Sequence, residues 1–190
     1  MLVVVNNLSL DGVMQAPALP DEDTRDGFAH GGWAVPYNDE VMGQAMGRRM
    51  AGNTGAMLFG RRTYENMYAF WPKQTDGNPY TEVLNRTQKY VVSTTLTEPL
   101  PWQNSTLIKD VAAIEDLKRD TNLTVLGSGA LLQTLIGANL VDQYVLLIHP
   151  LVLGTGRRMF DDGAVFSKLR LVDSLTTTTG VVIATYSRES

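Results

Sequence analysis

Short apolar runs alternate with helical apolar stripes along most of this 190-residue chain. Helical spacing of apolar residues occurs over residues 41–50, 111–117 and 131–136. The strand-like runs are rich in Val, Ile, Leu and Tyr and cover residues 2–5, 56–59, 90–94, 105–108, 123–126, 144–149, 169–175 and 181–186. Strands that alternate with helices form mostly parallel sheets with helices on both faces. The sequence therefore predicts an α/β fold with three layers, helix on sheet on helix.

The pattern changes after residue 140, where three strand runs follow one another with no helical stripe between them. Strands joined in this way pair as hairpins, so we expect antiparallel strands at one edge of the parallel sheet. The chain has no repeat, low-complexity tract or linker, and a chain of this length can bury a single core. We therefore expect one domain over residues 1–190.

Composition excludes several classes of function. The 16 basic and 20 acidic residues give a net charge of −4, which favours neither nucleic acid nor an anionic membrane surface. The absence of cysteine removes disulfides, thiolate catalysis and cysteine-ligated metals, and with His30 and His149 as the only histidines we expect no metal centre. The apolar run at residues 2–5 lacks a basic flank and is too short for a signal peptide or a membrane span. We expect a cytoplasmic protein that acts on a small molecule.

A strand-to-helix turn at residues 59–65 has the residue types of a phosphate site. Gly60 ends an apolar run, and Arg61, Arg62 and Thr63 open the next helix. The first N–H groups of a helix favour an anion, and arginine donates to phosphate through a fork of N–H groups. A second turn of this kind, Gly127-Ser128-Gly129, follows the run at residues 123–126. Two such turns indicate a ligand with separated phosphates, and a dinucleotide is the obvious candidate.

Residues 12–37 form a long segment rich in glycine and proline with few apolar anchors. A loop of this length within a compact domain is usually functional or partly disordered. Its place directly after the first strand favours a wall or lid over a binding cleft, against the alternative of a plain surface excursion. Trp33 within it is either a core aromatic or a flat wall against a nicotinamide or substrate ring, and we favour the wall.

Seven stretches follow one another in a specific order. They are Ser9-Leu10-Asp11-Gly12, Gly31-Gly32-Trp33 with Pro36-Tyr37, Phe59-Gly60-Arg61-Arg62-Thr63-Tyr64-Glu65, Val91-Val92-Ser93-Thr94, Gly127-Ser128-Gly129-Ala130-Leu131-Leu132-Gln133-Thr134-Leu135, Val141-Asp142-Gln143-Tyr144 and Pro150-Leu151-Val152-Leu153-Gly154-Thr155-Gly156-Arg157-Arg158-Met159-Phe160. This series resembles the dihydrofolate reductase-like superfamily. The nearer resemblance is to the C-terminal reductase domain of bifunctional riboflavin-biosynthesis deaminase-reductases and its stand-alone bacterial relatives.

The resemblance implies NADPH as the cofactor and a symmetric homodimer. It places the first turn against the adenosine phosphates and pyrophosphate, the residues after the third strand run near the 2′-phosphate, and the second turn against the pyrophosphate. The implied cofactor-binding residues are Gly60, Arg61, Arg62, Thr63, Ser93, Thr94, Gly127, Ser128, Gly129, Ala130 and Leu131. Glycines that permit close approach, with cations and hydroxyl donors for a 2′-phosphate, agree with this assignment.

Candidate catalytic and substrate-binding residues each have a structural alternative. Asp11 is either a turn cap or a carboxylate beside the nicotinamide, and Asp39 is either a helix cap or a substrate-binding carboxylate. His149 is a candidate substrate contact, or a hydrogen-bonded histidine at a strand end. In dihydrofolate reductase a carboxylate after a Trp-x-x-Pro stretch binds the pterin, and here Asn38 takes that place, with Asp39 one residue later.

Two departures limit the resemblance. The riboflavin-pathway reductases carry a glutamate where this chain has Gly127, which bears on their pyrimidine substrate, and without cysteine the chain cannot carry the zinc signature of a deaminase. We predict an NADPH-dependent reductase acting on a small heterocycle or carbonyl compound, resembling 5-amino-6-(5-phosphoribosylamino)uracil reductase of riboflavin biosynthesis. The alternatives are dihydrofolate reductase activity and a non-catalytic NADP(H)-binding protein.

Overall fold

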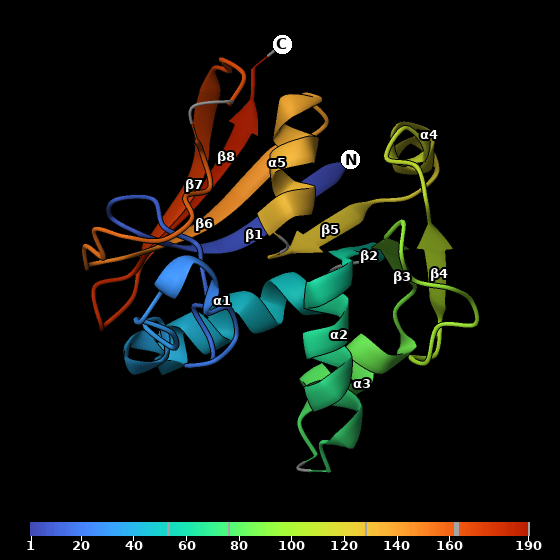
Figure 1. Cartoon of the computed structure of the whole chain (residues 1–190). Coiled ribbons are helices and arrows are strands. Elements are labelled where there is room, and N and C mark those ends of the chain that lie inside the picture. The colour runs from blue at the N-terminus through green and yellow to red at the C-terminus, as the bar shows by residue number, and fades with distance from the viewer. Residues whose placement is uncertain (53, 76, 128, 162–163, 190) are drawn as a thin grey trace.

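The computed structural model describes residues 1–52, 54–75, 77–127, 129–161 and 164–189. Eight strands within these ranges form one sheet in the order β4-β3-β2-β5-β1-β6-β8-β7 (Figure 1). The strands are β1 (Leu2–Ser9), β2 (Ala56–Gly60), β3 (Lys89–Val92), β4 (Ser105–Ile108), β5 (Leu123–Leu126), β6 (Gln143–His149), β7 (Leu169–Thr176) and β8 (Val182–Arg188). Each predicted apolar run therefore forms a strand.

The sheet is parallel from β4 to β6 and antiparallel beyond it. β8 pairs antiparallel with both β6 and β7, which makes β7 one edge of the sheet while β4 forms the other (Figure 1). The predicted change of pattern after residue 140 thus corresponds to the change from parallel to antiparallel pairing.

Helices cover both faces of the sheet. They are α1 (Glu40–Ala51), α2 (Arg61–Phe70), α3 (Pro79–Arg86), α4 (Ala113–Asp120) and α5 (Gly129–Gly137), with short 3₁₀ turns at Arg25–Gly27, Val35–Tyr37 and Trp71–Lys73. α3 was not among the predicted helices. The three-layer α/β fold predicted from the sequence is confirmed.

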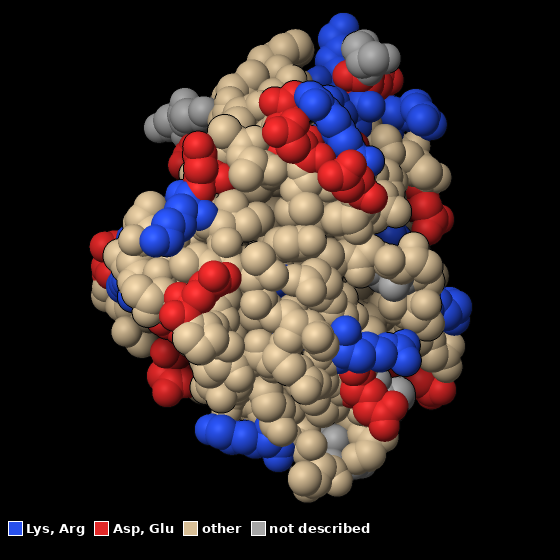
Figure 2. Space-filling view, turned by 90° about the vertical axis from the view of Figure 1, so that its right-hand side faces the viewer, with Lys and Arg blue, Asp and Glu red and all other residues tan. Residues whose placement is uncertain are grey.

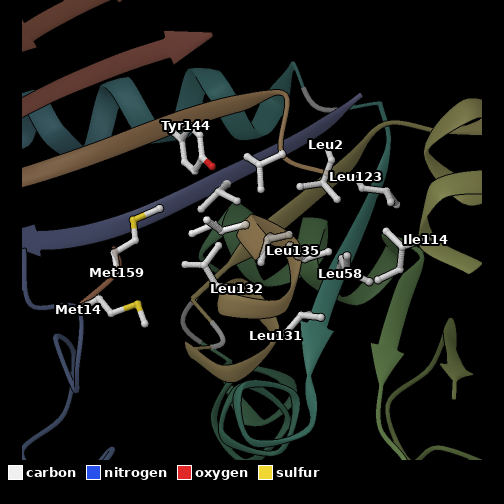
Figure 3. Packing of buried hydrophobic residues seen from close by; sticks show 14 of the residues in the cluster. Leu2, Met14, Leu58, Ile114, Leu123, Leu131, Leu132, Leu135, Tyr144 and Met159 are labelled. Carbon is white, nitrogen blue, oxygen red and sulfur yellow. The ribbon is translucent and has the colours of Figure 1, made fainter. Parts of the chain in front are cut away.

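Alternation along the strands assigns the helices to the two faces. Leu58 of β2 belongs to the core cluster of α4 and α5, where Leu131, Leu132 and Leu135 point toward the sheet (Figure 3). Its neighbour Phe59 points to the opposite face, into a cluster with residues of α2 and α3. α1 lies on that second face too, because Met42 packs on strands β6 and β8 in a separate cluster.

The expectation that the segment 12–37 has few apolar anchors is wrong. It has its own cluster of buried side chains, consisting of Val13, Ala16, Phe28, Trp33 and Ala34. At Gly31 a Cβ atom would stand 2.2 Å from the carbonyl oxygen of Pro20, so the two parts of the segment touch through their backbones. The segment is therefore a packed wall beside the end of β1.

The molecule has an ordinary mixed surface. On the face that carries β4 and α4, acidic and basic side chains are interspersed, and neither sign forms a continuous field (Figure 2). Within the described ranges, no helix has the length and apolar character needed to cross a membrane.

Candidate functional site

β1 and β5 part at the carboxyl edge of the sheet. Their pairing ends at Val5 and Leu126, whereas β1 continues beside β6 until Ser9 lies opposite His149. The chain leaves β1 through α1 toward β2, but leaves β5 through α5 toward β6 on the opposite face. Two neighbouring strands whose connections run to opposite sides form a topological switch point, which is the usual ligand site of an open α/β sheet.

The two predicted phosphate turns lie together at this edge. Gly60 is the N-cap of α2, and Gly127 follows β5, the strand next to β2. A Cβ atom at Gly127 would stand 3.9 Å from the Thr63 side chain, and Gly127 has a φ of +66° that favours glycine. Gly60 itself has an ordinary extended backbone, with φ at −81°. Pairing of β2 with β5 therefore brings the start of α2 against the turn after β5.

Cationic and hydroxyl groups extend the edge toward β3. Arg61 and Arg62 are exposed at the start of α2, and Arg61 lies 4.0 Å from the Glu65 carboxylate. Ser93 directly follows β3 and is buried, with its hydroxyl oxygen accepting the N–H groups of Thr95 and Leu96 at 3.1 Å each. Thr94 beside it is exposed.

A cavity of about 440 Å³ lies at the start of α5. Gly129 and Ala130 line it, and at Gly129 a Cβ atom would stand 3.3 Å from the methyl carbon of Met14. The opposite wall comes from the segment after β6, including Arg157 and Arg158. The Leu131 side chain turns away into the core, so its backbone alone faces this edge (Figure 3). Ser128 lies outside the described residues.

Asp11 ties the turn after β1 to the segment after β6. Its carboxylate accepts hydrogen bonds from the Ser9 hydroxyl at 2.6 Å and from the N–H groups of Leu153 at 3.1 Å and Gly154 at 2.9 Å. The Arg158 guanidinium lies 3.5 Å away. The Ser9 hydroxyl and these backbone donors lower the pKa of Asp11 to about 2. Asp11 is therefore an ionised anchor at neutral pH and does not carry a proton to donate.

Asp39 holds a second junction, between α1 and the turn before β8. One carboxylate oxygen caps α1 by accepting the Met42 N–H at 2.7 Å. The other accepts the hydroxyl of Thr178 at 2.6 Å and the N–H groups of Thr178 at 2.7 Å and Thr179 at 3.2 Å. These donors, led by the Thr178 hydroxyl, lower the pKa of Asp39 to about 2. The carboxylate is thus ionised and already occupied by four protein donors.

Trp33 and His149 meet beneath the start of α1. The Trp33 indole is buried and donates its N–H to the Gln15 carbonyl oxygen at 2.7 Å, so it presents no open flat face. His149 is fully buried, with Trp33 and Tyr37 packed edge-on at ring-centroid distances of 5.2 and 5.5 Å. Its Nε2 lies 2.9 Å from Asn7 Oδ1, while Nδ1 is buried without a partner among the described residues. Burial lowers the pKa of His149 to about 4, so the ring is neutral at pH 7.

Two residues at this site were not singled out from the sequence. Asn7 lies within β1, and the available signal was the polar pair Asn6-Asn7 after the apolar run at residues 2–5. Gln15 is buried; its amide nitrogen donates to the Asp23 and Arg25 carbonyls and its oxygen accepts the Arg157 N–H at 2.9 Å. No sequence pattern marked Gln15, because its partners are backbone atoms, which any residue type provides.

The described residues offer no metal centre, since no three His, Cys, Asp or Glu side chains among them are grouped to hold an ion. The helix starts, glycine turns and exposed arginines instead suit an anionic ligand that extends along the carboxyl edge. The fold and this edge together define the class: a three-layer α/β protein with two glycine turns near its topological switch point.

Comparison with known proteins gives the family. The family described as the RibD C-terminal domain matches residues 1–183, and the chain belongs to it. The chain is also similar to the uncharacterized protein YyaP of Bacillus subtilis (strain 168), at 30% identity over 138 residues, which are 68% of this chain and 72% of that protein. The family predicted from the ordered motifs is thereby confirmed.

Solved structures share the fold over the full length of the chain. A protein from Shewanella sp. PV-4 named for riboflavin biosynthesis has a TM-score of 0.71 at 20% identity, with 99% of its own chain covered. A pyrimidine reductase-like protein from Corynebacterium diphtheriae has a TM-score of 0.67 at 11% identity and 92% coverage. Dihydrofolate reductase from Enterococcus faecalis, solved with NADP(H) and RAB-propyl, has a TM-score of 0.60 at 14% identity and 97% coverage.

Proposed function

We propose that the protein is an NADPH-dependent reductase of a small heterocyclic or carbonyl compound. The observation that carries this proposal is the meeting of two glycine turns, each at a helix start, beside the point where β1 and β5 part. Membership of the RibD C-terminal domain family supports it, because the turns belong to the motifs that define the resemblance.

The residues of this edge divide the work of binding. The starts of α2 and α5 offer backbone N–H groups to the pyrophosphate, with Thr63 and Gly127 at the closest approach. Arg61 and Thr94 lie on the β2 and β3 side, where a 2′-phosphate would need a cation and a hydroxyl donor. When bound, the reduced nicotinamide supplies the hydride; the protein contributes orientation and electrostatics.

The anchoring of Asp39 disfavours dihydrofolate reductase activity. A pterin presents the N–H donors of an amino-amidine, and a carboxylate that receives them needs available lone pairs. Asp39 already accepts four protein hydrogen bonds, and Asn38 provides no carboxylate. We therefore favour carbonyl and pyrimidine compounds over dihydrofolate as substrates.

A substrate panel tests the proposal. We expect NADPH to bind in calorimetric titration, and its oxidation at 340 nm to accelerate with at least one member of a panel containing an aromatic aldehyde, a ribitylaminopyrimidine and 7,8-dihydrofolate. Binding of NADPH without turnover of any member would favour the non-catalytic NADP(H)-binding alternative. Absence of NADPH binding would overturn the proposal.

We also propose a symmetric homodimer formed through β7. This edge strand exposes apolar side chains along its length, with Leu171 51%, Val172 49% and Leu175 37% exposed. A second copy would cover these side chains and the unpaired edge, which otherwise invites aggregation. Sedimentation velocity at micromolar concentration should show a dimer, and Leu171→Lys with Leu175→Lys should shift it to monomer.

The control for the dimer is Val35→Lys, because Val35 is equally exposed, at 49%, but lies in the 3₁₀ turn before α1. This variant should remain dimeric. A wild-type protein that sediments as a monomer at this concentration would contradict the proposal, as would a double variant of β7 that stays dimeric.

A further inference from the structure

The side-chain oxygen of Asn7 is hydrogen-bonded, whereas its side-chain nitrogen is available to a ligand. Its Oδ1 lies 2.9 Å from His149 Nε2, and because an amide oxygen only accepts, Nε2 must carry the proton. Asn7 Nδ2 donates to no described residue, and Asn7 is only partly buried. The side chain therefore has both N–H donors available for a ligand, while its oxygen already accepts from His149.

The surroundings hold this orientation. His149 is fully buried between the rings of Trp33 and Tyr37, so it cannot turn without disturbing both. A rotated Asn7 amide could bond to Nε2 only if the ring proton moved to Nδ1, and a buried Nδ1–H would have no described acceptor. The histidine thus fixes which end of the amide faces outward.

Asn7 also lies near the topological switch point, where open α/β sheets usually bind their ligands. It is two residues beyond Val5, the last residue of β1 that pairs with β5, which is about 7 Å farther along the strand. It points to the face of α1, since alternate residues Val3 and Val5 pack in the α1 cluster. The carboxylates near this position, Asp11 and Asp39, are both occupied by protein donors.

We propose that Asn7 is a substrate-binding residue that donates an amide N–H to a carbonyl oxygen of the substrate, with His149 as its positioning residue. The inference rests on the proposed reductase function and narrows its substrate class to neutral carbonyl compounds such as cyclic amides. A 2-aminopteridine ring, which presents N–H donors, is bound best by a free carboxylate, and the carboxylates of Asp11 and Asp39 already accept protein donors.

The test uses the full chain loaded with NADP⁺ and two unreactive probes, 1-tetralone and tetralin, which differ only in the carbonyl group. Calorimetric titration should show the carbonyl probe binding at least about tenfold more tightly, the value of one well-formed hydrogen bond and its desolvation. Asn7→Asp replaces the donor by a carboxylate of equal size and should weaken the carbonyl probe about tenfold or more, with NADP⁺ affinity kept. Asn122→Asp is the matched control, because Asn122 is exposed directly before β5, at the amino end of that strand, and should leave both affinities unchanged.

Variants of His149 separate positioning from packing. His149→Phe keeps an aromatic ring but loses the N–H toward Asn7, and it should weaken the carbonyl probe without changing NADP⁺ affinity. His149→Gln restores a donor and should recover carbonyl binding.

The outcomes distinguish failure of the proposed reductase function from failure of the proposed role of Asn7. Failure of the wild type to bind NADP⁺ overturns the reductase function and this inference with it. Binding of NADP⁺ combined with no preference for the carbonyl probe, or with a preference that survives Asn7→Asp, overturns the role of Asn7 alone.

Discussion

Lowering the pH from 7 to 4.5 should remove about 2 kcal/mol from the free energy of unfolding, chiefly through His149. Burial lowers the pKa of this ring from 6.5 to about 4. Between these values the unfolded chain takes up a proton that the folded protein does not. Stability present above pH 6.5 is therefore lost as the pH falls toward 4, at about 1.4 kcal/mol for each pH unit.

Urea unfolding of the wild type and His149→Phe at the two pH values measures this loss. The variant should lose much less stability on acidification, whatever its stability at pH 7. Asp11 and Asp39, with their pKa lowered from 3.8 to about 2, contribute stability that is lost below this window. His30→Gln, a change at the exposed histidine, should keep the acid loss. A His149→Phe protein with the full wild-type loss would refute the assignment.

The strands could be predicted because each is a short apolar run, and burial on both faces leaves little room for polar residues. α3 could not be predicted in this way. It is only eight residues long, and a residue beyond its C-terminal end helps to stabilise it. The Lys89 ammonium, fully buried at the start of β3, donates to the carbonyls of Leu84, Asn85 and Thr87 at the end of α3. Hydrogen bonds from a lysine to carbonyl groups produce no periodic pattern of apolar residues, so the sequence did not indicate this helix.

The site was predictable where local sequence determines local shape. A glycine turn at a helix start is such a feature, and pairing of β2 with β5 then placed Thr63 beside Gly127. The roles of Asp11 and Asp39 depend on partners more than 130 residues away, at Gly154 and Thr178. Sequence spacing does not show such contacts, so the sequence could not distinguish a structural carboxylate from a catalytic one.

The same limit applies to Asn7 and His149, which are 142 residues apart. Their hydrogen bond follows from the parallel pairing of β1 with β6, in which Ser9 lies opposite His149. From the sequence alone, His149 is a residue at the end of a strand and Asn7 is a polar residue within one, and nothing connects the two. The structure joins them into one unit with a defined tautomer, because the amide oxygen requires the proton on Nε2.

NADPH should bind more tightly than NADH, and Arg61 should carry much of the difference. The two cofactors differ only in the 2′-phosphate, so the difference must come from groups that meet it. The Arg61 side chain is 45% exposed, and its 4.0 Å contact with Glu65 is too loose to hold it in one position. A hydrogen bond to a charged group contributes about 1.5–3 kcal/mol. Arg61→Ala should therefore weaken NADPH about ten- to a hundredfold and leave NADH nearly unchanged.

Calorimetric titration of both cofactors into the wild type, Arg61→Ala and Arg119→Ala measures this selectivity. Arg119 is the matched control because it is an exposed arginine of α4 that also pairs with a carboxylate four residues away, Glu115. Its loss should change neither affinity, since α4 begins after β4 and lies on the opposite face of the sheet from α2. Equal weakening of NADH and NADPH by Arg61→Ala would mean that Arg61 binds a phosphate common to both cofactors, and the 2′-phosphate would then have to be read by Arg62 or the hydroxyls after β3.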